Sequence, residues 1–173
     1  MSHNITILGA GVSGIGAAIL ASNKNFNVFI SDSNSIDKKS KKVLDNHNIT
    51  WEENGHDLAK ILTSDLVIKS PGIPNHINLI QKIIKKEISI ISEIEFASRF
   101  TKAKIVAITG TNGKTTTALL IYKILNDAGY NVLLAGNIGL SFAAEISKKD
   151  YDFVVLEVSS FQLDNIVDFR PSI

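Results

Sequence analysis

The stretch from Ile105 to Thr117 constrains the fold of this chain more than any other. The apolar, β-branched run Ile105–Ile108 predicts a buried strand, and Ala118–Ala128 has the apolar spacing of a helix. Between them, glycines and small residues allow successive backbone N–H groups to point at phosphate oxygens, and the helix N-terminus adds partial positive charge. The order strand, loop, helix therefore predicts a phosphate-binding loop. In such a loop Lys114 reaches the β- and γ-phosphates, and Thr115 offers its hydroxyl to Mg²⁺.

This loop departs from the general Walker pattern G-x-x-x-x-G-K-[ST]. The pattern requires a glycine at position 108, where this chain has Ile108, and the loop is the shorter Gly110–Thr115. The strand before it and the helix after it favour a nucleotide-binding interpretation. The alternative is an ordinary strand-to-helix turn, with a glycine for tightness and a threonine as the helix cap.

A second glycine-rich turn follows the first apolar strand of the chain. Ile5–Leu8 is followed by Gly9–Gly14, which has the spacing G-x-G-x-x-G, and Ile15–Ser22 is predicted to be a helix. In this context the glycines allow the turn, the close approach of a diphosphate and the packing of helix on strand. Asp32 ends the next predicted strand, Val28–Ile30, at about the distance where an acidic residue meets a ribose. These features predict a Rossmann-like unit that binds a diphosphate ligand, without selecting NAD in particular.

The rest of the chain alternates predicted strands and helices, which indicates an α/β protein. Further strands are expected at Leu66–Ile68, Ile88–Ile91, Asn131–Ala135 and Phe153–Leu156, and further helices at Asp37–His47, His76–Lys86, Glu93–Phe100 and Ser141–Ser147. The lysine-rich helix among them, Asp37–His47, is expected to be solvated. The boundary between two units is expected between residues 92 and 103.

Two of these strands end in residues suited to ligand binding. Ser70–Pro74 places two prolines around a glycine after Leu66–Ile68, at the end of the strand where open α/β sheets bind ligands. A plain tight turn is an equal alternative there. Glu157 ends the run Phe153–Leu156 beside the phosphate loop, which predicts a second Mg²⁺ ligand. A structural salt bridge is the alternative, because a buried carboxylate without a partner is costly.

Composition excludes several classes of protein. Hydrophobic residues make up 45% of the 173 residues, as in a globular protein, and the net charge of +1 argues against a nucleic-acid-coating surface. The absence of cysteine excludes disulfides, a thiol nucleophile and thiolate metal sites. No apolar run approaches the length of a membrane span and no basic region precedes one, so a soluble, cytoplasmic protein is predicted. The histidines lack metal-like spacing and are expected at the surface: His3, His47, His56 and His76.

Three motifs together resemble the Mur ligases, the ATP-dependent amide-forming enzymes of peptidoglycan synthesis. They are Gly110–Thr116, Gly136–Gly139 and Glu157–Leu163, while Gly9–Gly14 and Ser70–Pro74 match the UDP-sugar-binding domain of that family. The family uses the shortened phosphate loop, which accounts for the missing Walker glycine. The second and third motifs look most like the member that adds D-glutamate to UDP-N-acetylmuramoyl-L-alanine.

The resemblance implies a fold, a reaction and a set of site residues. The fold would be a Rossmann-like, UDP-sugar-binding domain at residues 1–92 and the front half of a P-loop mononucleotide-binding α/β domain at 93–173. The reaction would proceed through an acyl phosphate, with Lys114, Asn137 and Glu157 as catalytic residues and with Thr115 and Glu157 as ligands of Mg²⁺. ATP would be bound by Gly110, Thr111, Asn112, Gly113, Lys114, Thr115 and Thr116. The UDP substrate would be bound by Val12, Ser13, Asp32, Ser33, Ser70, Pro71, Gly72, Asn137, Ser159 and Gln162.

Members of the family carry a complete central domain and a C-terminal domain that closes over ATP, whereas this chain ends at Ile173. We therefore expect a monomeric N-terminal fragment that is inactive alone, with an open sheet edge and an uncovered apolar face. Two alternatives stay open. One is a nicotinamide-dependent oxidoreductase, which Gly9–Gly14 and Asp32 allow but which leaves the phosphate loop unexplained. The other is a non-catalytic UDP-sugar-binding fragment.

Overall fold

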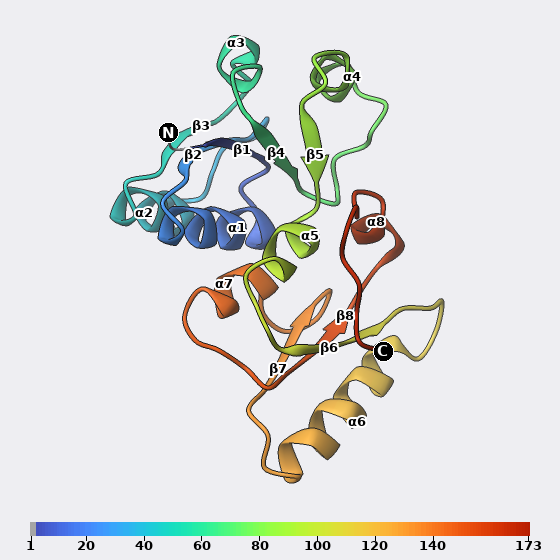
Figure 1. Ribbon diagram of the computed structural model, residues 1–173. Helices are drawn as coiled ribbons and strands as arrows, with labels where there is room; N and C mark the ends of the chain where they lie inside the picture. The colour runs from blue at the N-terminus through green and yellow to red at the C-terminus, as the bar shows by residue number, and fades with distance from the viewer. Residues whose placement is uncertain (1–2) are drawn as a thin grey trace.

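The computed structural model describes residues 3–173 and contains two parallel β-sheets (Figure 1). The first sheet has five strands in the order β3-β2-β1-β4-β5, and all neighbouring pairs are parallel. Its strands are β1 (Asn4–Leu8), β2 (Asn27–Ser31), β3 (Thr50–Glu52), β4 (Leu66–Lys69) and β5 (Ser89–Ile91). The strand order reverses between β1 and β4, and open α/β sheets bind ligands at such a switch point, beyond the carboxyl ends of the strands. The loops after β1 and β4 flank that point.

Helices cover both faces of the first sheet. They are α1 (Val12–Asn23), α2 (Lys38–Asn46), α3 (Leu58–Ile61), α4 (Asn78–Lys85) and α5 (Glu93–Ser98). Side chains alternate across a strand, so Ile7 of β1 packs in one core cluster with α1, α2 and α5, while its neighbour Leu8 packs in another with α3 and α4. The first unit is therefore a three-layer α/β arrangement of Rossmann-like type, as predicted.

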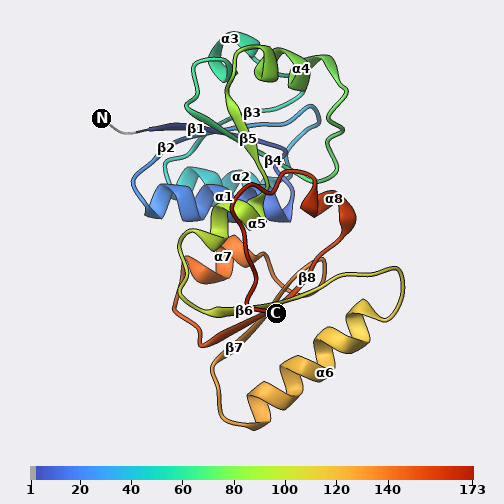
Figure 2. The same cartoon turned by 45° about the vertical axis from the view of Figure 1, so that its right-hand side comes forward.

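The second sheet has three parallel strands in the order β6-β8-β7. Its elements are the strands β6 (Lys104–Ile108), β7 (Val132–Gly136) and β8 (Phe153–Glu157) and the helices α6 (Lys114–Asp127), α7 (Phe142–Ile146) and α8 (Ser160–Leu163). The helix α7 covers the face turned toward the first unit, and α6 covers the opposite face (Figure 2). Both faces of this sheet thus carry a helix, and the exposed apolar side chains are Leu119, Leu120 and Ile124 on α6 itself.

The free edge of β6 is not fully open, which corrects part of the expectation of an open sheet edge. Ser172 donates its N–H to the carbonyl of Ile105 at 2.8 Å, and Ala107 donates to the carbonyl of Ile173 at 2.9 Å. The last residues of the chain thus satisfy backbone groups of this edge strand. This pairing lowers the tendency of β6 to pair with another chain.

The two units share one hydrophobic core cluster, in which α1 and α5 of the first unit pack against α7 of the second. The approach of α1 to α7 is close, because a Cβ atom built on Gly16 would lie 2.0 Å from the Oγ of Ser141. Glu93, at the start of α5, is buried and accepts hydrogen bonds from the Ser141 hydroxyl at 2.9 Å and from the Ala143 N–H at 2.8 Å. Close packing of small residues and the buried carboxylate of Glu93 therefore contribute to the contact between the units.

The predicted strands and helices are confirmed, with shifts of a few residues at their ends. The helix α6 begins at Lys114 rather than at Ala118, because the phosphate loop itself leads into its first turn. The short elements β3, α3 and α8 were not predicted, and none has more than four residues. In the described residues 3–173, no helix has the length and apolar character needed to cross a membrane.

Candidate functional site

The phosphate loop joins the end of β6 to the first residue of α6. Gly110 and Gly113 have φ angles of +137° and +77°, a region that favours glycine, so the backbone curls before the helix starts. The residues from Gly110 to Gly113 are exposed. Lys114 donates from its Nζ atom to the carbonyl of Gly110 at 2.7 Å, and this hydrogen bond links the two ends of the loop. The loop thus presents backbone N–H groups, a helix N-terminus and an ammonium group in one place.

Glu157 lies at the centre of the second sheet, at the carboxyl end of β8. It pairs in register with Ile108 of β6 on one side and with Gly136 of β7 on the other, so the residues that follow those strands surround it. Its side chain is 1% exposed. The Thr115 hydroxyl donates to Oε2 of Glu157 at 2.8 Å, and the Asn137 amide donates to Oε1 at 3.0 Å. Three residues predicted to act in catalysis or metal binding therefore meet at one carboxylate.

The predicted alternative for Glu157, a structural salt bridge, is not formed within residues 3–173. Among the described residues 3–173, its partners are neutral donors, and no lysine or arginine forms an ion pair with it. The same part of the chain holds no cluster of three or more histidine, aspartate or glutamate side chains that could bind a metal alone. A cation at Glu157 would have to take most of its ligands from phosphate oxygens and water, as Mg²⁺ does at nucleotide sites.

In the first unit, Asp32 organises the glycine-rich loop. Its Oδ2 atom accepts the N–H of Ala10 at 2.7 Å, and its Oδ1 atom accepts the N–H of Asn34 at 2.8 Å. Val12 and Ser13 open helix α1 directly after this loop, with Val12 75% exposed. Backbone N–H groups thus donate to both carboxylate oxygens of Asp32, the residue that was predicted to lie at a ribose or at the uracil end. The structure gives Asp32 a part in shaping the loop that the sequence analysis did not assign.

The loop Ser70–Pro74 lies directly against the glycine-rich loop. A Cβ atom on Gly9 would lie 2.6 Å from the Ser70 Oγ, which is buried and has no hydrogen-bond partner among the described residues. The loop is held by Lys69, a buried lysine whose Nζ donates to the carbonyl of Ile73 at 2.6 Å. Burial lowers the pKa of Lys69, while the charge of Asp164 acts in the opposite direction.

Lys69 is a site-shaping residue that the sequence analysis missed. The available signal was a lysine that ends an apolar strand directly before Ser-Pro-Gly, where a solvated charge is not expected.

The residues Ser159 and Gln162 bind each other at the start of α8. The carboxamide oxygen of Gln162 accepts the N–H of Ser159 at 2.9 Å and its hydroxyl at 3.0 Å. A cavity of about 660 Å³ separates α8 from the loop after β4. It is lined by Pro71, Gly72, Ile73, Pro74, Asn75, His76, Phe161 and Asp164. The third motif and the Ser70–Pro74 loop, far apart in sequence, therefore face one space.

The predicted site residues fall into two groups, one on each sheet. Thr115, Asn137 and Glu157 are brought together by hydrogen bonds at the second sheet. Those of the first sheet lie at the start of α1 and in the loops after β2 and β4, and Ser33 is exposed. Two cavities join the first group to the second unit: Phe161 of α8 shares one with Pro71 and Gly72, and Leu140 shares the other with Val12. The roles of the individual residues toward ligands stay predictions.

Comparison with known families gives a match to each unit. Residues 4–79 match the family described as the MurD N-terminal domain, and residues 108–173 match the Mur ligase middle domain. The chain belongs to the Mur ligase family. The resemblance drawn from the three motifs is thereby confirmed.

Individual relatives agree with this assignment. The chain is 54% identical over 169 residues to the UDP-N-acetylmuramoylalanine–D-glutamate ligase of Bacteroides fragilis, which covers 98% of this chain and 38% of that protein. It is 48% identical over 173 residues to the ligase of the same name from Porphyromonas gingivalis, covering 100% and 38%. Among solved structures, a murein peptide ligase from Psychrobacter arcticus shares the fold, with a TM-score of 0.60 and 23% identity over 90% of this chain and 37% of that one. The chain thus spans 38% of the length of these two curated relatives.

Proposed function

We propose that this chain supplies the UDP-substrate site and the phosphate loop of an ATP-dependent ligase that joins D-glutamate to UDP-N-acetylmuramoyl-L-alanine. The observation that carries the proposal is the meeting of Thr115, Asn137 and Glu157 beside the loop that ends in Lys114. The relatives that bear this ligase name match along the whole chain, which supports the same substrates here.

The reaction explains why a carboxylate-joining enzyme needs a phosphate loop. A carboxylate is a poor electrophile at neutral pH, so its oxygen first attacks the γ-phosphorus of ATP, releasing ADP and forming an acyl phosphate. The amine of D-glutamate then attacks the acyl carbon, the C–O bond to phosphate breaks, and the amine loses a proton. The products are the amide, ADP and inorganic phosphate. Such phosphoryl transfers are catalysed mainly by positioning and charge stabilisation, which are the properties of this loop.

The residues around Glu157 fit a magnesium ion by the chemistry of their donors. Thr115 and Glu157 offer a hydroxyl and a carboxylate oxygen 2.8 Å apart, and hard cations such as Mg²⁺ prefer oxygen ligands. Bound there, Mg²⁺ would neutralise phosphate charge. Lys114 would leave the Gly110 carbonyl for a phosphate oxygen, because a charged acceptor makes the stronger hydrogen bond. Asn137 would keep the Glu157 carboxylate oriented toward the loop.

The first unit is proposed to bind the UDP end of the substrate at the switch point between β1 and β4. Val12 and Ser13 at the N-terminus of α1 are proposed to meet the diphosphate, and the buried Ser70 hydroxyl, which has no partner among residues 3–173, lies where the two loops meet. Ser159 and Gln162 flank Phe161, which lines the cavity together with Pro71 and Gly72, and they are proposed to bind the muramoyl-alanine arm. The alternative of a nicotinamide site leaves the phosphate loop that ends in Lys114 without a role.

The activity test uses Lys114→Ala in a protein of the relatives' full length that carries this chain. Acyl-phosphate formation should fall by about 100-fold or more, because a preorganised charge is removed from the transferring phosphoryl group. Binding of UDP-N-acetylmuramoyl-L-alanine, measured by calorimetry, should change less than about twofold, within the small effect of a distant site. Lys123→Ala is the matched control, because Lys123 lies on the same helix and pairs only with exposed Asp127. Full ligase activity in the Lys114 variant contradicts the proposed role.

A further inference from the structure

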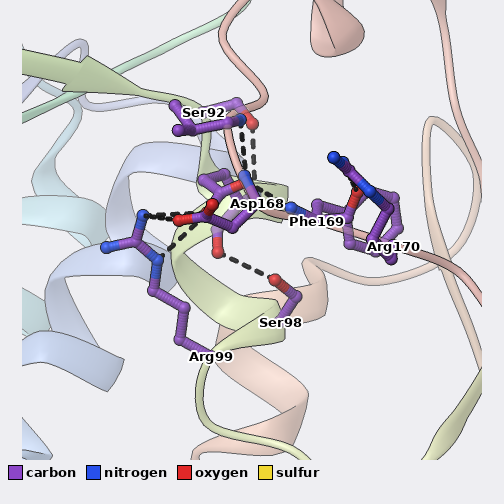
Figure 3. Close-up of polar contacts among 8 residues, drawn as sticks. Ser92, Ser98, Arg99, Asp168, Phe169 and Arg170 are labelled. Atoms are coloured by element: carbon purple, nitrogen blue, oxygen red, sulfur yellow. Dashed lines mark hydrogen bonds and ion pairs between the residues drawn. The ribbon is translucent and has the colours of Figure 1, made fainter.

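The buried carboxylate of Glu95 on α5 accepts five hydrogen bonds. Its Oε2 atom accepts the backbone N–H groups of Val167 at 3.0 Å, Asp168 at 3.0 Å and Phe169 at 2.8 Å. Its Oε1 atom accepts two N–H groups of Arg99, at 3.0 and 2.8 Å. Figure 3 shows Arg99 on one side of these contacts and Phe169 on the other. The Glu95 side chain is 0% exposed.

Three successive N–H groups that converge on one oxygen form an anion-binding nest, and here the anion belongs to the chain itself. Burial alone raises the pKa of Glu95, but the N–H groups of Val167 and Phe169, with Arg99 and Asp168, together hold that pKa below its usual range. The group is therefore ionised at neutral pH, and its hydrogen bonds are charge-assisted. Removing the charge would leave three backbone donors with a weaker acceptor or none.

The nest fixes residues 167–169, which form the far end of the segment 158–169 that follows β8. The near end is held by Val158, whose N–H donates to the carbonyl of Ile108 at 2.9 Å. Toward the far end, Ser92 next to α5 donates its N–H to the carbonyl of Asn165 at 2.9 Å, and the Glu95 contacts follow directly. The segment between these anchors contains α8, with Phe161 facing the cavity below the β4–α4 loop. Figure 2 shows this segment crossing back from the second sheet to the first unit.

We propose that Glu95 is a positioning residue for the UDP-substrate arm, a role that rests on the proposed function. Its carboxylate clamps residues 167–169 to the first unit and thereby sets where Ser159 and Gln162 stand relative to the loop Ser70–Pro74. The residue does not touch the substrate. It acts through the backbone of the segment that follows α8, a helix of only four residues.

The test compares Glu95→Gln with Asp127→Asn in the full chain. Both substitutions remove one negative charge, but Asp127 is exposed and pairs only with Lys123. We expect amide hydrogen exchange at residues 167–169 to accelerate about tenfold or more in Glu95→Gln, because the charged acceptor is lost. Exchange in β8 should not change. The dissociation constant for UDP-N-acetylmuramoyl-L-alanine, measured by calorimetry, should rise about tenfold, and the Asp127 control should match the wild type.

A second variant keeps the proposal testable where Glu95→Gln does not fold. Arg99→Gln removes the hydrogen-bond donors to Oε1 of Glu95 and leaves the nest intact. Because Arg99 is partly exposed, we expect smaller rises in the exchange rate at residues 167–169 and in the dissociation constant than in Glu95→Gln. Accelerated exchange with unchanged substrate affinity in either variant overturns the positioning role, and unchanged exchange overturns the clamp itself. A wild-type chain that binds no UDP substrate contradicts the proposed function and overturns the positioning role with it. The exchange result then still decides whether the clamp exists, so the two failures are distinguishable.

Discussion

Gly16→Ala tests whether the two units are held by the close approach of α1 to α7. In an ordinary helix interior this substitution stabilises by about 1 kcal/mol. Here the new Cβ atom would lie 2.0 Å from the Ser141 Oγ and 2.9 Å from the Ser141 Cβ, closer than side chains can approach. Ser141 would have to move, and the helix α1 would be pushed away from α7.

The cost can be worked out from what Ser141 does. Overpacking of a core contact costs about 1–3 kcal/mol. The displaced hydroxyl also leaves the Ala144 N–H, which it caps at 3.2 Å, and the Glu93 carboxylate at 2.9 Å, each a loss of about 1 kcal/mol. After the gain in helix propensity is subtracted, the net loss is about 2–4 kcal/mol. For a chain of this size that corresponds to a fall in Tm of roughly 4–16 °C.

Thermal unfolding followed by circular dichroism measures this effect, and a double-mutant cycle isolates its cause. Ser141→Gly removes the clashing atoms and retains an acceptable helix cap. In that background Gly16→Ala should cost at least about 1 kcal/mol less than in the wild type, because the two residues are in contact. The reasoning is refuted when Gly16→Ala raises Tm, as helix propensity alone requires, or when its cost is the same in both backgrounds.

Two further substitutions give distinct outcomes. Burial raises the pKa of Glu93, so its ionisation opposes folding at every pH above the unfolded value of 4.5. The Tm of Glu93→Gln relative to wild type should therefore rise between pH 5 and 8, by about 2–4 °C for each kcal/mol relieved. A difference in Tm that does not change with pH counts against this reasoning. Asp32→Asn replaces one acceptor oxygen by an amide that faces the N–H of Ala10 or Asn34. It should destabilise the ligand-free chain by about 1–3 kcal/mol in denaturant unfolding, whereas a residue that serves only as a ligand contact would leave that stability unchanged.

The elements that could be predicted from sequence are those whose signal is local. Runs such as Phe153–Leu156 identify buried parallel strands, and glycine turns mark where helices begin. The strand β3 has only three residues and exists because Thr50 and Trp51 pair with Phe29 and Ile30 of β2. Three residues are too few for a periodic pattern, so tertiary pairing decides such an element.

The site could be predicted in its parts but not in its connections. Asn137 and Glu157 were each identified, yet their hydrogen bond depends on β8 inserting between β6 and β7, which the order of strands along the chain does not reveal. Glu95 was only one residue of a predicted helix, because its backbone partners lie 72 to 74 residues away. Contacts at that separation leave no trace in local composition.

The two glutamates of α5 show why this short helix matters to the contact between the two units. Residues two apart on a helix point to nearly opposite sides, so Glu93 and Glu95 reach different parts of the second unit. Glu93 receives two neutral donors at the N-terminus of α7, which do not offset its burial. Glu95 accepts hydrogen bonds from three backbone N–H groups and a guanidinium, and these donors offset the effect of burial on its pKa. Because most of these donors are backbone groups, the contact between the two units depends on the carboxylates of α5 more than on the side chains that they contact.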